Sequence, residues 1–494
     1  MNKIRKDIHK RLISLGEDIS EKSISKIERT ERPQQSLIKT DEVYFDFSKQ
    51  RINRKSLDYL LTIPDLVKLR ENLNRLFKGQ IANPTENRTV SHTVYREKNP
   101  LDEFSLVSSE RQKIKNFLDQ TFSKRNYKNL ICLCIGGSRL GPEILSEFQT
   151  NNEEINIYFC SSYDLLELKA ALTKCDQKDT IFFVLSKSFE TQEIIKNLNH
   201  AKLWLQENPA HDFEDRFYGV SADSSLMSSH GIKKENQFEI LDSLGGRYSL
   251  WSSMSLPAFV NSGFESYLSL LEGAKLADEH VRSSPWESNI SVLMALLSIW
   301  NVNSLNINNH GIFTYNYRIR SLAKYIAQLS MESNGKSINH KSIESPFFTS
   351  PLVWGGYGVE SQHSTFQWLM QGKTFSSCDF IGVNDGLEES YDSQEMLLSQ
   401  VIAMTHGESN SKKPFKSVRG NNPCSIFQLN SLNLKSLGFL LALYEHKVFI
   451  EALILGIDPF DQWGVQLGKK LVEKSKKQDN FLIKYFPSEI HPGS

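Results

Sequence analysis

The chain has 494 residues, a length that favours about three domains. Lys and Arg together number 58, as do Asp and Glu, so the formal net charge is zero. This balance argues against a nucleic-acid coat or a polybasic membrane binder, because both depend on excess positive charge. A small anion can still bind in a locally positive pocket of a neutral protein.

Six cysteines with no C-x-x-C spacing predict neither a disulfide framework nor a zinc site. Reduced thiols in the cytosol are the simpler interpretation. No stretch reaches the ~18 apolar residues of a membrane span, and the first 16 residues lack the apolar run of a signal peptide. We therefore expect a cytoplasmic protein with no metal, no nucleic-acid partner and no membrane contact.

The first part of the chain, residues 1–100, is charged and has helical spacing where it has any pattern. We expect an accessory region that is mostly helical and poor in strands. From about residue 101 short apolar runs alternate with helical segments, which predicts βαβ units and a parallel sheet. The expected strands are 129–135, 155–160, 180–185, 217–220 and 238–241.

A helical stretch over 264–301 precedes a second alternating region, which predicts a second α/β domain. Its expected strands are 351–354, 378–383 and 425–429, and its expected helices are 318–331, 364–371, 434–455 and 460–474. The predicted fold class is α/β, with α/β domains over 101–290 and 291–475 and a tail over 476–494. Ligand sites in such folds lie at the carboxyl ends of the strands.

Residues 135–142 (IGGSRLGP) follow the first expected strand. Glycines there let backbone N–H groups approach a ligand, and Pro142 suits the first turn of a helix. The segment is neither a Rossmann fingerprint nor a P-loop. A simple tight turn between strand and helix explains it equally well.

Residues 185–193 (LSKSFETQE) follow another expected strand and open a helix. Three hydroxyls and the ammonium of Lys187 gather where a helix N-terminus already favours an anion, which predicts a phosphate cradle. The alternative is ordinary N-capping by Ser188 or Thr191.

Two further segments place charged groups near glycines. Arg247 follows the pair Gly245 and Gly246, and could reach a site with little steric obstruction, although a surface arginine in a turn is commoner. Gln328 and Glu332 are four residues apart, which predicts one helix face, and Gly335 is expected to end that helix. A carboxylate at such a helix end is usually solvated.

The last two candidates carry a histidine and a lysine. Gln362 and His363 are expected at the start of a helix, where a lone histidine is more often structural than catalytic. Gln462 and Lys469 are seven residues apart and are expected to share one helix face, which could equally be a solvated face.

In this order, the segments resemble the glucose-6-phosphate isomerase (phosphoglucose isomerase) family. The resemblance runs from about residue 100 to 475 and is most specific in GGRYSLWS (245–252), MESNGK (331–336) and FDQWGVQLGK (460–469). It implies a pair of sugar-isomerase (SIS) α/β/α sandwich domains, a homodimer, and the interconversion of glucose 6-phosphate and fructose 6-phosphate without a cofactor.

The resemblance also implies a role for each matching residue. Glu332 would be the base, Arg247 would face the enediolate, and His363 and Lys469 would assist ring opening, with His363 supplied by the partner subunit. The residues implied to bind the substrate are Ser186, Lys187, Ser188 and Thr191 at the phosphate, Gly137, Ser138 and Gly246 at the sugar, and Glu193, Gln328 and Gln462 at its hydroxyls.

The sequence departs from the family pattern at Ser188, which replaces the family's usual Thr and keeps the hydroxyl, and at two further places. The family's Gly-Glu-Pro-Gly-Thr-Asn-Gly before Gln-His reads here as GGYGVES over residues 355–361, and the usual Glu of the last signature is Gln466. Two rival functions stay open at this point. One is an isomerase of another sugar phosphate, such as mannose 6-phosphate, and the other is a non-catalytic regulator that binds sugar phosphates.

Overall fold

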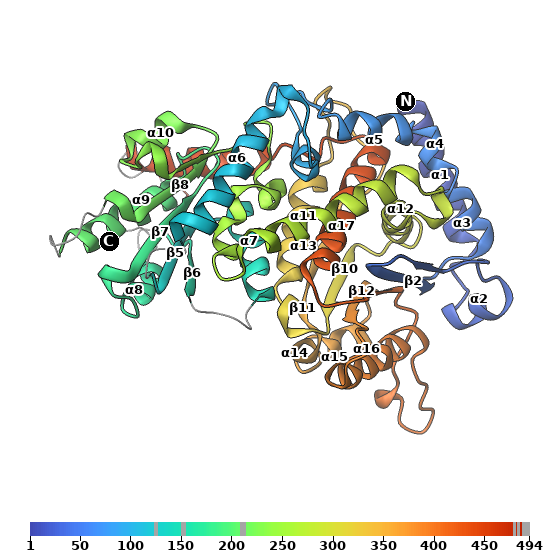
Figure 1. Cartoon of the computed structure of the whole chain (residues 1–494). Coiled ribbons are helices and arrows are strands. Elements are labelled where there is room, and N and C mark those ends of the chain that lie inside the picture. The colour runs from blue at the N-terminus through green and yellow to red at the C-terminus, as the bar shows by residue number, and fades with distance from the viewer. Residues whose placement is uncertain (123–126, 150–154, 208–213, 478–480, 482–484, 487–494) are drawn as a thin grey trace. The chain divides into compact units, whose positions relative to one another are not determined.

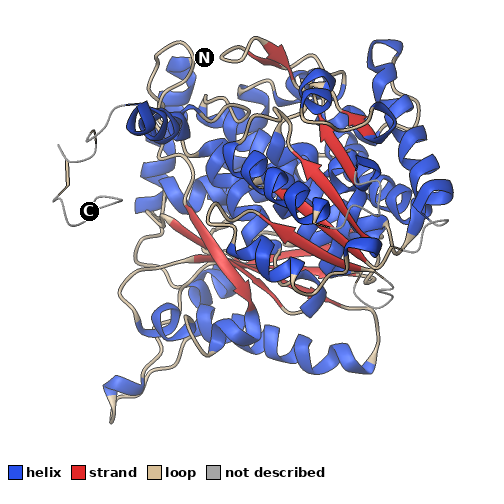
Figure 2. Cartoon of the chain, turned by 90° about the vertical axis from the view of Figure 1, so that its left-hand side faces the viewer, coloured by secondary structure: helices blue, strands red, loops and turns tan. Residues whose placement is uncertain are grey.

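A computed structural model describes residues 1–122, 127–149, 155–207, 214–477, 481 and 485–486. The chain divides into two units, Met1–Pro459 and Phe460–Ser494. The first unit holds two main sheets with helices packed around their strands (Figure 1, Figure 2).

The first main sheet is parallel and has the order β6-β5-β7-β8-β9. Its strands are β5 (Asn129–Cys134), β6 (Asn156–Cys160), β7 (Thr180–Leu185), β8 (Phe217–Ser221) and β9 (Gln237–Glu239). All five strands expected here are confirmed. Every residue of β5 and β7 is buried, as their continuous apolar runs require in a sheet covered on both faces.

Helices cover both faces of this sheet. One face carries α8 (Leu166–Leu172), α9 (Gln192–Gln206) and α10 (Ser224–Ser229), whose apolar residues form one core with those of the strands. On the other face, Phe117 packs edge-on against the rings of Phe183, Tyr218 and Phe238. The chain order places β6 and β7 on opposite sides of β5, so the edge between β5 and β7 is a topological switch point, where α/β sheets bind ligands.

The second main sheet has the order β1-β2-β13-β12-β10-β11. Its strands are β1 (Leu37–Lys39), β2 (Val43–Lys49), β10 (Asn309–Thr314), β11 (Leu352–Tyr357), β12 (Ser377–Val383) and β13 (Cys424–Leu429). Strands β10 to β13 pair in parallel, and β2 pairs antiparallel with β13. The expected strands at 351–354, 378–383 and 425–429 are confirmed, whereas β10 was not expected.

The expectation that residues 1–100 are poor in strands is wrong for residues 37–49. They form a hairpin that extends the second sheet, beside β13 and near the N-terminal helices (Figure 1). In β2 the apolar residues alternate, so Val43, Phe45 and Phe47 point inward, and the ring of Phe45 lies 4.8 Å from that of Phe427. A short hairpin, β3 (Ala82–Asn83) and β4 (Arg88–Thr89), follows.

The remaining helices connect and flank the sheets. In the first unit these are α1 (Asn2–Glu17), α2 (Ile24–Thr30), α3 (Arg54–Leu60), α4 (Ile63–Leu66), α5 (Leu69–Phe77), α6 (Ser105–Asn116), α7 (Gly137–Phe148), α11 (Gly263–Ser283), α12 (Ile290–Asn303), α13 (Leu322–Asn334), α14 (Gly358–Gln362), α15 (Phe366–Gln371), α16 (Glu388–His406) and α17 (Leu434–Leu455). The helix expected over 434–455 is confirmed, and α16 was not expected. The described part of the second unit contains α18 (Gln466–Lys477).

A buried charge network sits beneath the segment that carries Arg247. The guanidinium of Arg96 pairs with the carboxylates of Asp278 and Glu445, and all three side chains are essentially unexposed. The indole of Trp251 donates to Glu445 at 2.9 Å and lies 4.3 Å from the Arg96 guanidinium. Since Trp251 ends the 3-10 helix η8 (Gly246–Trp251), the network fixes the base of that helix.

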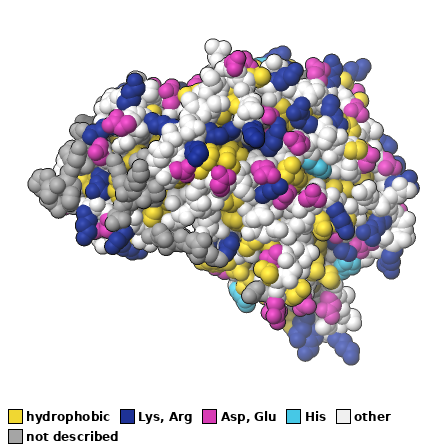
Figure 3. Space-filling view, viewed as in Figure 1, with side chains coloured by type: hydrophobic (Ala, Val, Ile, Leu, Met, Phe, Trp, Pro, Cys, Tyr) yellow, Lys and Arg dark blue, Asp and Glu magenta, His cyan; other side chains and the backbone are white. Residues whose placement is uncertain are grey.

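Charges on the visible surface are mixed. Lys and Arg side chains are interspersed with Asp and Glu over the face shown in Figure 3, as the equal numbers of acidic and basic residues suggest. Among the described residues, none of the helices has the length and hydrophobicity needed to cross a bilayer. In the same part of the chain, no cluster of His, Cys, Asp and Glu side chains could hold a metal ion.

Candidate active site

The turn after β5 lies close to helix α13 and to the 3-10 helix η8. Gly136 has φ +58°, which suits glycine, and a Cβ there would lie 3.3 Å from the Nε2 atom of Gln328 on α13. A Cβ on Gly137 would lie only 2.4 Å from the carbonyl carbon of Gly246. Both positions therefore require glycine for the backbone to approach α13 and η8.

Helix α7 begins earlier than the sequence indicates. It starts at Gly137, so Pro142 lies in its second turn rather than its first. The positive φ of Gly136 lets the chain enter the helix directly after the strand. Ser138 is buried in the first turn of this helix, next to the approach of Gly137 to Gly246.

Arg247 is buried rather than on the surface, with 4% of the residue exposed. Its Nη1 atom lies 3.4 Å from Oε1 of Glu332, its Nε donates to the hydroxyl of Ser333 at 2.7 Å, and its Nη2 donates to the carbonyl of Pro459. A guanidinium held at three points cannot turn freely, so its charge has a fixed direction.

Helix α13 presents the carboxylate that Arg247 faces. Gln328 and Glu332 share one helix face as predicted, and the Gln328 amide donates to Oε2 of Glu332 at 2.7 Å. The helix ends at Asn334 with Gly335 as its C-cap, which confirms the predicted stop. The side chain of Glu332 is 27% exposed, so a carboxylate held by an amide and a guanidinium is still open to a ligand from one side.

The loop predicted to bind an anion, residues 185–193, follows β7, which lies beside β5 at the switch point of the first sheet. After β7, the buried Ser186 hydroxyl accepts from the N–H of Phe189 at 3.1 Å, and Phe189 has φ +51° in the turn. Thr191 is the N-cap of α9 but its side chain makes no capping hydrogen bond. The hydroxyl of Ser188 accepts a long 3.4 Å bond from the N–H of Glu190, and Glu193 lies in the first turn of α9.

Lys187 supplies the positive charge of this loop. Its Nζ atom lies 3.3 Å from Oδ1 of Asp242, whose side chain is 73% exposed. Such a solvated ion pair is worth little, so the ammonium can turn to a bound anion at small cost. Because Asp242 is five residues before Arg247, the segment 242–247 connects the anion loop with the carboxylate of Glu332.

The other predicted site residues come from two further segments of the chain. His363 is exposed and is the C-cap of α14, so the expectation that it begins a helix is wrong. Gln462 precedes α18, which begins only at Gln466, so Gln462 and Lys469 do not share a helix face. The one-turn 3-10 helix Trp463–Val465 separates Gln462 from α18, and both residues belong to the second unit.

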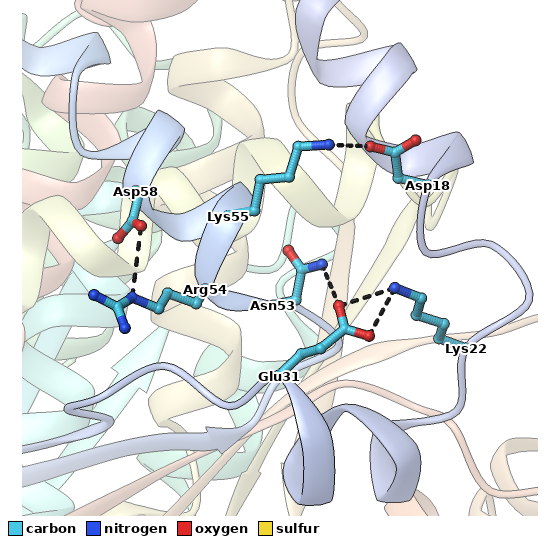
Figure 4. A pocket seen from close by; sticks show the side chains of 7 residues that line it. All are labelled: Asp18, Lys22, Glu31, Asn53, Arg54, Lys55 and Asp58. Atoms are coloured by element: carbon cyan, nitrogen blue, oxygen red, sulfur yellow. Dashed lines mark hydrogen bonds and ion pairs between the residues drawn. The ribbon is translucent and has the colours of Figure 1, made fainter.

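A surface pocket of about 730 Å³ lies elsewhere in the first unit, between α1, α2 and α3 (Figure 4). It is lined by Asn53 and by three acidic and three basic residues, which are Asp18, Glu31, Asp58, Lys22, Arg54 and Lys55. Every charge is paired with another lining residue, as at Lys22–Glu31 and Lys55–Asp18, both 2.7 Å. The charges of this pocket therefore neutralise one another and hold the three helices together.

Three contributors to the cluster were not singled out from the sequence. These are Gly136, Tyr248 and Ser333, and each is the immediate neighbour of a predicted residue in its motif. Tyr248 and Ser333 are buried, and their hydroxyl oxygens lie 2.9 Å apart. Tyr248 and Ser333 could have been found only because they stand next to predicted residues in GGRYSLWS and MESNGK. Sequence spacing does not show which hydroxyls face an arginine.

The chain is similar to known proteins over most of its length. The family model described as phosphoglucose isomerase matches residues 46–485. The glucose-6-phosphate isomerase of Acinetobacter baumannii strain AYE is 33% identical over 95% of this chain and 93% of its own length. That of Buchnera aphidicola from Cinara cedri is 36% identical over 87% of this chain and 85% of its own.

A solved structure agrees over nearly the whole chain. The crystal structure of a glucose-6-phosphate isomerase from Chlamydia trachomatis superposes with a TM-score of 0.87 at 27% identity, covering 97% of this chain and 96% of that one. A hypothetical protein from Thermus thermophilus superposes with a TM-score of 0.66 at 18% identity, covering 85% of this chain and 99% of that one, which is a likeness of fold alone.

Proposed function

Because this chain belongs to the phosphoglucose isomerase family, its reaction is the isomerisation of glucose 6-phosphate to fructose 6-phosphate, and we propose that Glu332 is the catalytic base. This reversible step serves glycolysis and gluconeogenesis. The observation that carries the assignment is the Glu332 carboxylate, which accepts from the Gln328 amide and faces the Arg247 guanidinium at 3.4 Å.

The chemistry needs a base over C1 and C2 of the opened sugar and a positive group for the oxygen that becomes negative. Glu332 takes the proton from one carbon and returns it to the other, through a cis-enediolate. Arg247 faces the enediolate oxygen, and charge that forms only near the transition state gains most from a fixed cation. The three contacts that hold Arg247 support this role.

The loop 186–191 binds the substrate phosphate in this scheme. Ser186, Lys187, Ser188 and Thr191 offer three hydroxyls, an ammonium and the N-terminus of α9. Phosphate does not react, but its binding energy positions the sugar over the base. Gly137, Ser138 and Gly246 would line the sugar, and Glu193 would meet a hydroxyl.

Ring opening and assembly complete the proposal. His363 and Lys469 assist ring opening, Gln462 orients a hydroxyl, and His363 comes from the partner subunit of a homodimer. The exposure of His363 at the end of α14 supports a role across an interface, since it makes the ring reachable by another chain. The domain proposed over 101–290 includes all strands of the first sheet, whereas that over 291–475 includes only β10 to β13 of the second. The enzyme works in the cytoplasm.

The base is tested by Glu332→Gln in a coupled assay. Purified protein receives fructose 6-phosphate, and the glucose 6-phosphate formed is read through a dehydrogenase that reduces NADP. We expect turnover to fall by at least about a thousandfold with an unchanged thermal midpoint, because the amide keeps the shape but cannot accept the proton. Glu344→Gln makes the same change at an exposed position and is the matched control.

A rate close to that of the control would refute the base assignment. Turnover of mannose 6-phosphate alone would move the assignment to another sugar phosphate. If the unaltered protein binds fructose 6-phosphate without any turnover, the result would instead support a non-catalytic regulator that binds sugar phosphates.

The shared site is tested by mixing two inactive variants, Glu332→Gln and His363→Ala. A hybrid dimer then contains one site with both changes and one intact site. Random exchange of subunits therefore restores about a quarter of the unaltered activity if His363 crosses the interface. If His363 acts within its own subunit, the mixture stays inactive.

A further inference from the structure

The guanidinium of Arg247 donates to the hydroxyl of Ser333, which in turn contacts the hydroxyl of Tyr248, and the isomerisation itself uses neither hydroxyl. We propose that Ser333 and Tyr248 are positioning residues that fix this guanidinium, so that Nη1 stays directed toward Glu332 and the substrate. The inference rests on the proposed function, because it concerns the group that would face the enediolate.

Ser333 is the centre of this arrangement. Its hydroxyl oxygen accepts from Nε of Arg247 at 2.7 Å and lies 2.9 Å from the hydroxyl oxygen of Tyr248. Ser333 is fully buried, and Tyr248 is 1% exposed. Water cannot replace either contact easily, so loss of one hydroxyl leaves a buried donor without its acceptor.

The protons of the cluster can be assigned in one closed arrangement. Arg247 has only donors, so the Ser333 oxygen accepts from Nε and is free to donate its own proton to Tyr248. Tyr248 then donates to the carbonyl of Pro459 at 3.4 Å, which also accepts from Nη2 of Arg247. Burial raises the pKa of Tyr248, so the phenol keeps the proton that this arrangement requires.

The acceptors themselves are tied down through the backbone. The ammonium of Lys336 donates to the carbonyl of Ser333 at 2.8 Å and to that of Asp458 at 2.6 Å. Asp458 precedes Pro459, so one lysine holds the segments that carry both acceptors of Arg247. A cation fixed through two of its nitrogens has little freedom to follow the substrate, and its third nitrogen faces one direction.

This geometry matters because charge stabilisation depends on alignment. A displacement of about 1 Å in a catalytic group can cost roughly a hundredfold in rate. We therefore expect Ser333→Ala and Tyr248→Phe to lower kcat by about ten- to a hundredfold, with KM changed by less than about threefold. The phosphate loop, which dominates binding, is untouched by either change.

The matched control is Ser330→Ala. Ser330 lies on the same helix, is 3% exposed, and its hydroxyl has no hydrogen-bond partner within the described part of the chain. We expect its kcat to match the unaltered enzyme, and all three variants to keep its thermal midpoint within a few degrees. Tyr248→Phe keeps the ring and its packing, so it tests the hydroxyl even if Ser333→Ala proves unstable.

A double-mutant cycle separates positioning from general destabilisation. In an Arg247→Lys background the Nε donor is gone, so Ser333→Ala should lower kcat by less than about threefold further. Turnover of fructose 6-phosphate is measured for each variant with the coupled assay. Strong coupling with Arg247 and an unaffected control would support the inference.

Two results would overturn it without touching the proposed function. One is a kcat of Ser333→Ala and Tyr248→Phe equal to that of Ser330→Ala. The other is that Ser333→Ala lowers kcat by the same factor in the Arg247→Lys background as in the unaltered protein, which would indicate a structural role. Absence of turnover in the unaltered protein would overturn the proposed function and this inference together.

Discussion

Glu110 on α6 makes the stability of the folded chain depend on pH in a direction opposite to most carboxylates. The side chain is buried, its Oε1 accepts from the N–H of Ser253 at 2.7 Å, and burial raises its pKa from 4.5 to about 7. A raised pKa means that the folded state binds the proton more tightly than the unfolded state. The stabilisation is complete below pH 4.5 and is lost as the pH rises through 7.

The perturbation that removes this dependence is Glu110→Gln. The difference between the two pKa values corresponds to about 3 kcal/mol in the free energy of unfolding. Relative to the Gln variant, the unaltered protein should therefore lose most of this amount between pH 5 and pH 8. The Gln side chain has similar volume and cannot ionise, so its own stability is expected to change little from this site.

The assay is urea denaturation of both proteins at several pH values between 5 and 8. Glu103→Gln, at an exposed position before the same helix, is the control and should run parallel to the unaltered protein. A stability difference between Glu110→Gln and the unaltered protein that stays constant over this pH range would refute the reasoning. So would a difference that changes in the opposite direction.

Two other predictions concern the site. Gly137→Ala places a Cβ 2.4 Å from the Gly246 carbonyl carbon and should cost about 1–3 kcal/mol, seen as a lower thermal midpoint. Gly246→Ala, whose Cβ would meet nothing within 4 Å, should keep the midpoint, and equal losses would contradict the steric account. Lys187→Met should raise the KM for fructose 6-phosphate at least about tenfold while lowering kcat much less, because phosphate binding loses its ammonium. Asp242→Asn is the control and should lower or preserve that KM, whereas an unchanged KM in Lys187→Met would exclude the loop as the phosphate site.

The turns after β5 and β7 could be located from the sequence because their signals are local. A buried strand that ends in glycine or in serine and threonine marks the turns after β5 and β7, and a four-residue spacing places Gln328 with Glu332. Capping rules also locate the end of α13 at Gly335. These features depend only on residues a few positions apart.

The elements that the sequence missed depend on distant partners. Strand β10 begins Asn-His-Gly, which is a weak strand signal, and it is formed because it lies between β11 and β12 in the sheet. The sequence of the β1–β2 hairpin alone suggests part of a helical region. Its strands form because β2 pairs with β13, which is far away in the sequence. The burial of Arg247 likewise required knowing that Ser333 and Pro459 converge on it.

The pairing of β2 with β13 has a consequence for synthesis on the ribosome. Thr40, beside β2, and Asn430, just after β13, meet in the folded sheet although they are 390 residues apart. At roughly 5–20 residues per second, about 20 to 80 s pass between the emergence of the two strands. During that time the edge of β2 that pairs with β13 has no native partner, and an unpaired strand edge invites pairing with other chains.

The second sheet therefore closes only when the chain is nearly complete. Contacts between such distant residues slow folding, because loop closure must precede the gain from pairing. A chain truncated before Cys424 would keep β10, β11 and β12 but would lack β13, the strand that β2 pairs with, and the ring of Phe427 that packs on Phe45. Nascent chains of this protein are thus expected to need protection by chaperones at their N-terminal hairpin until about the last seventh of synthesis.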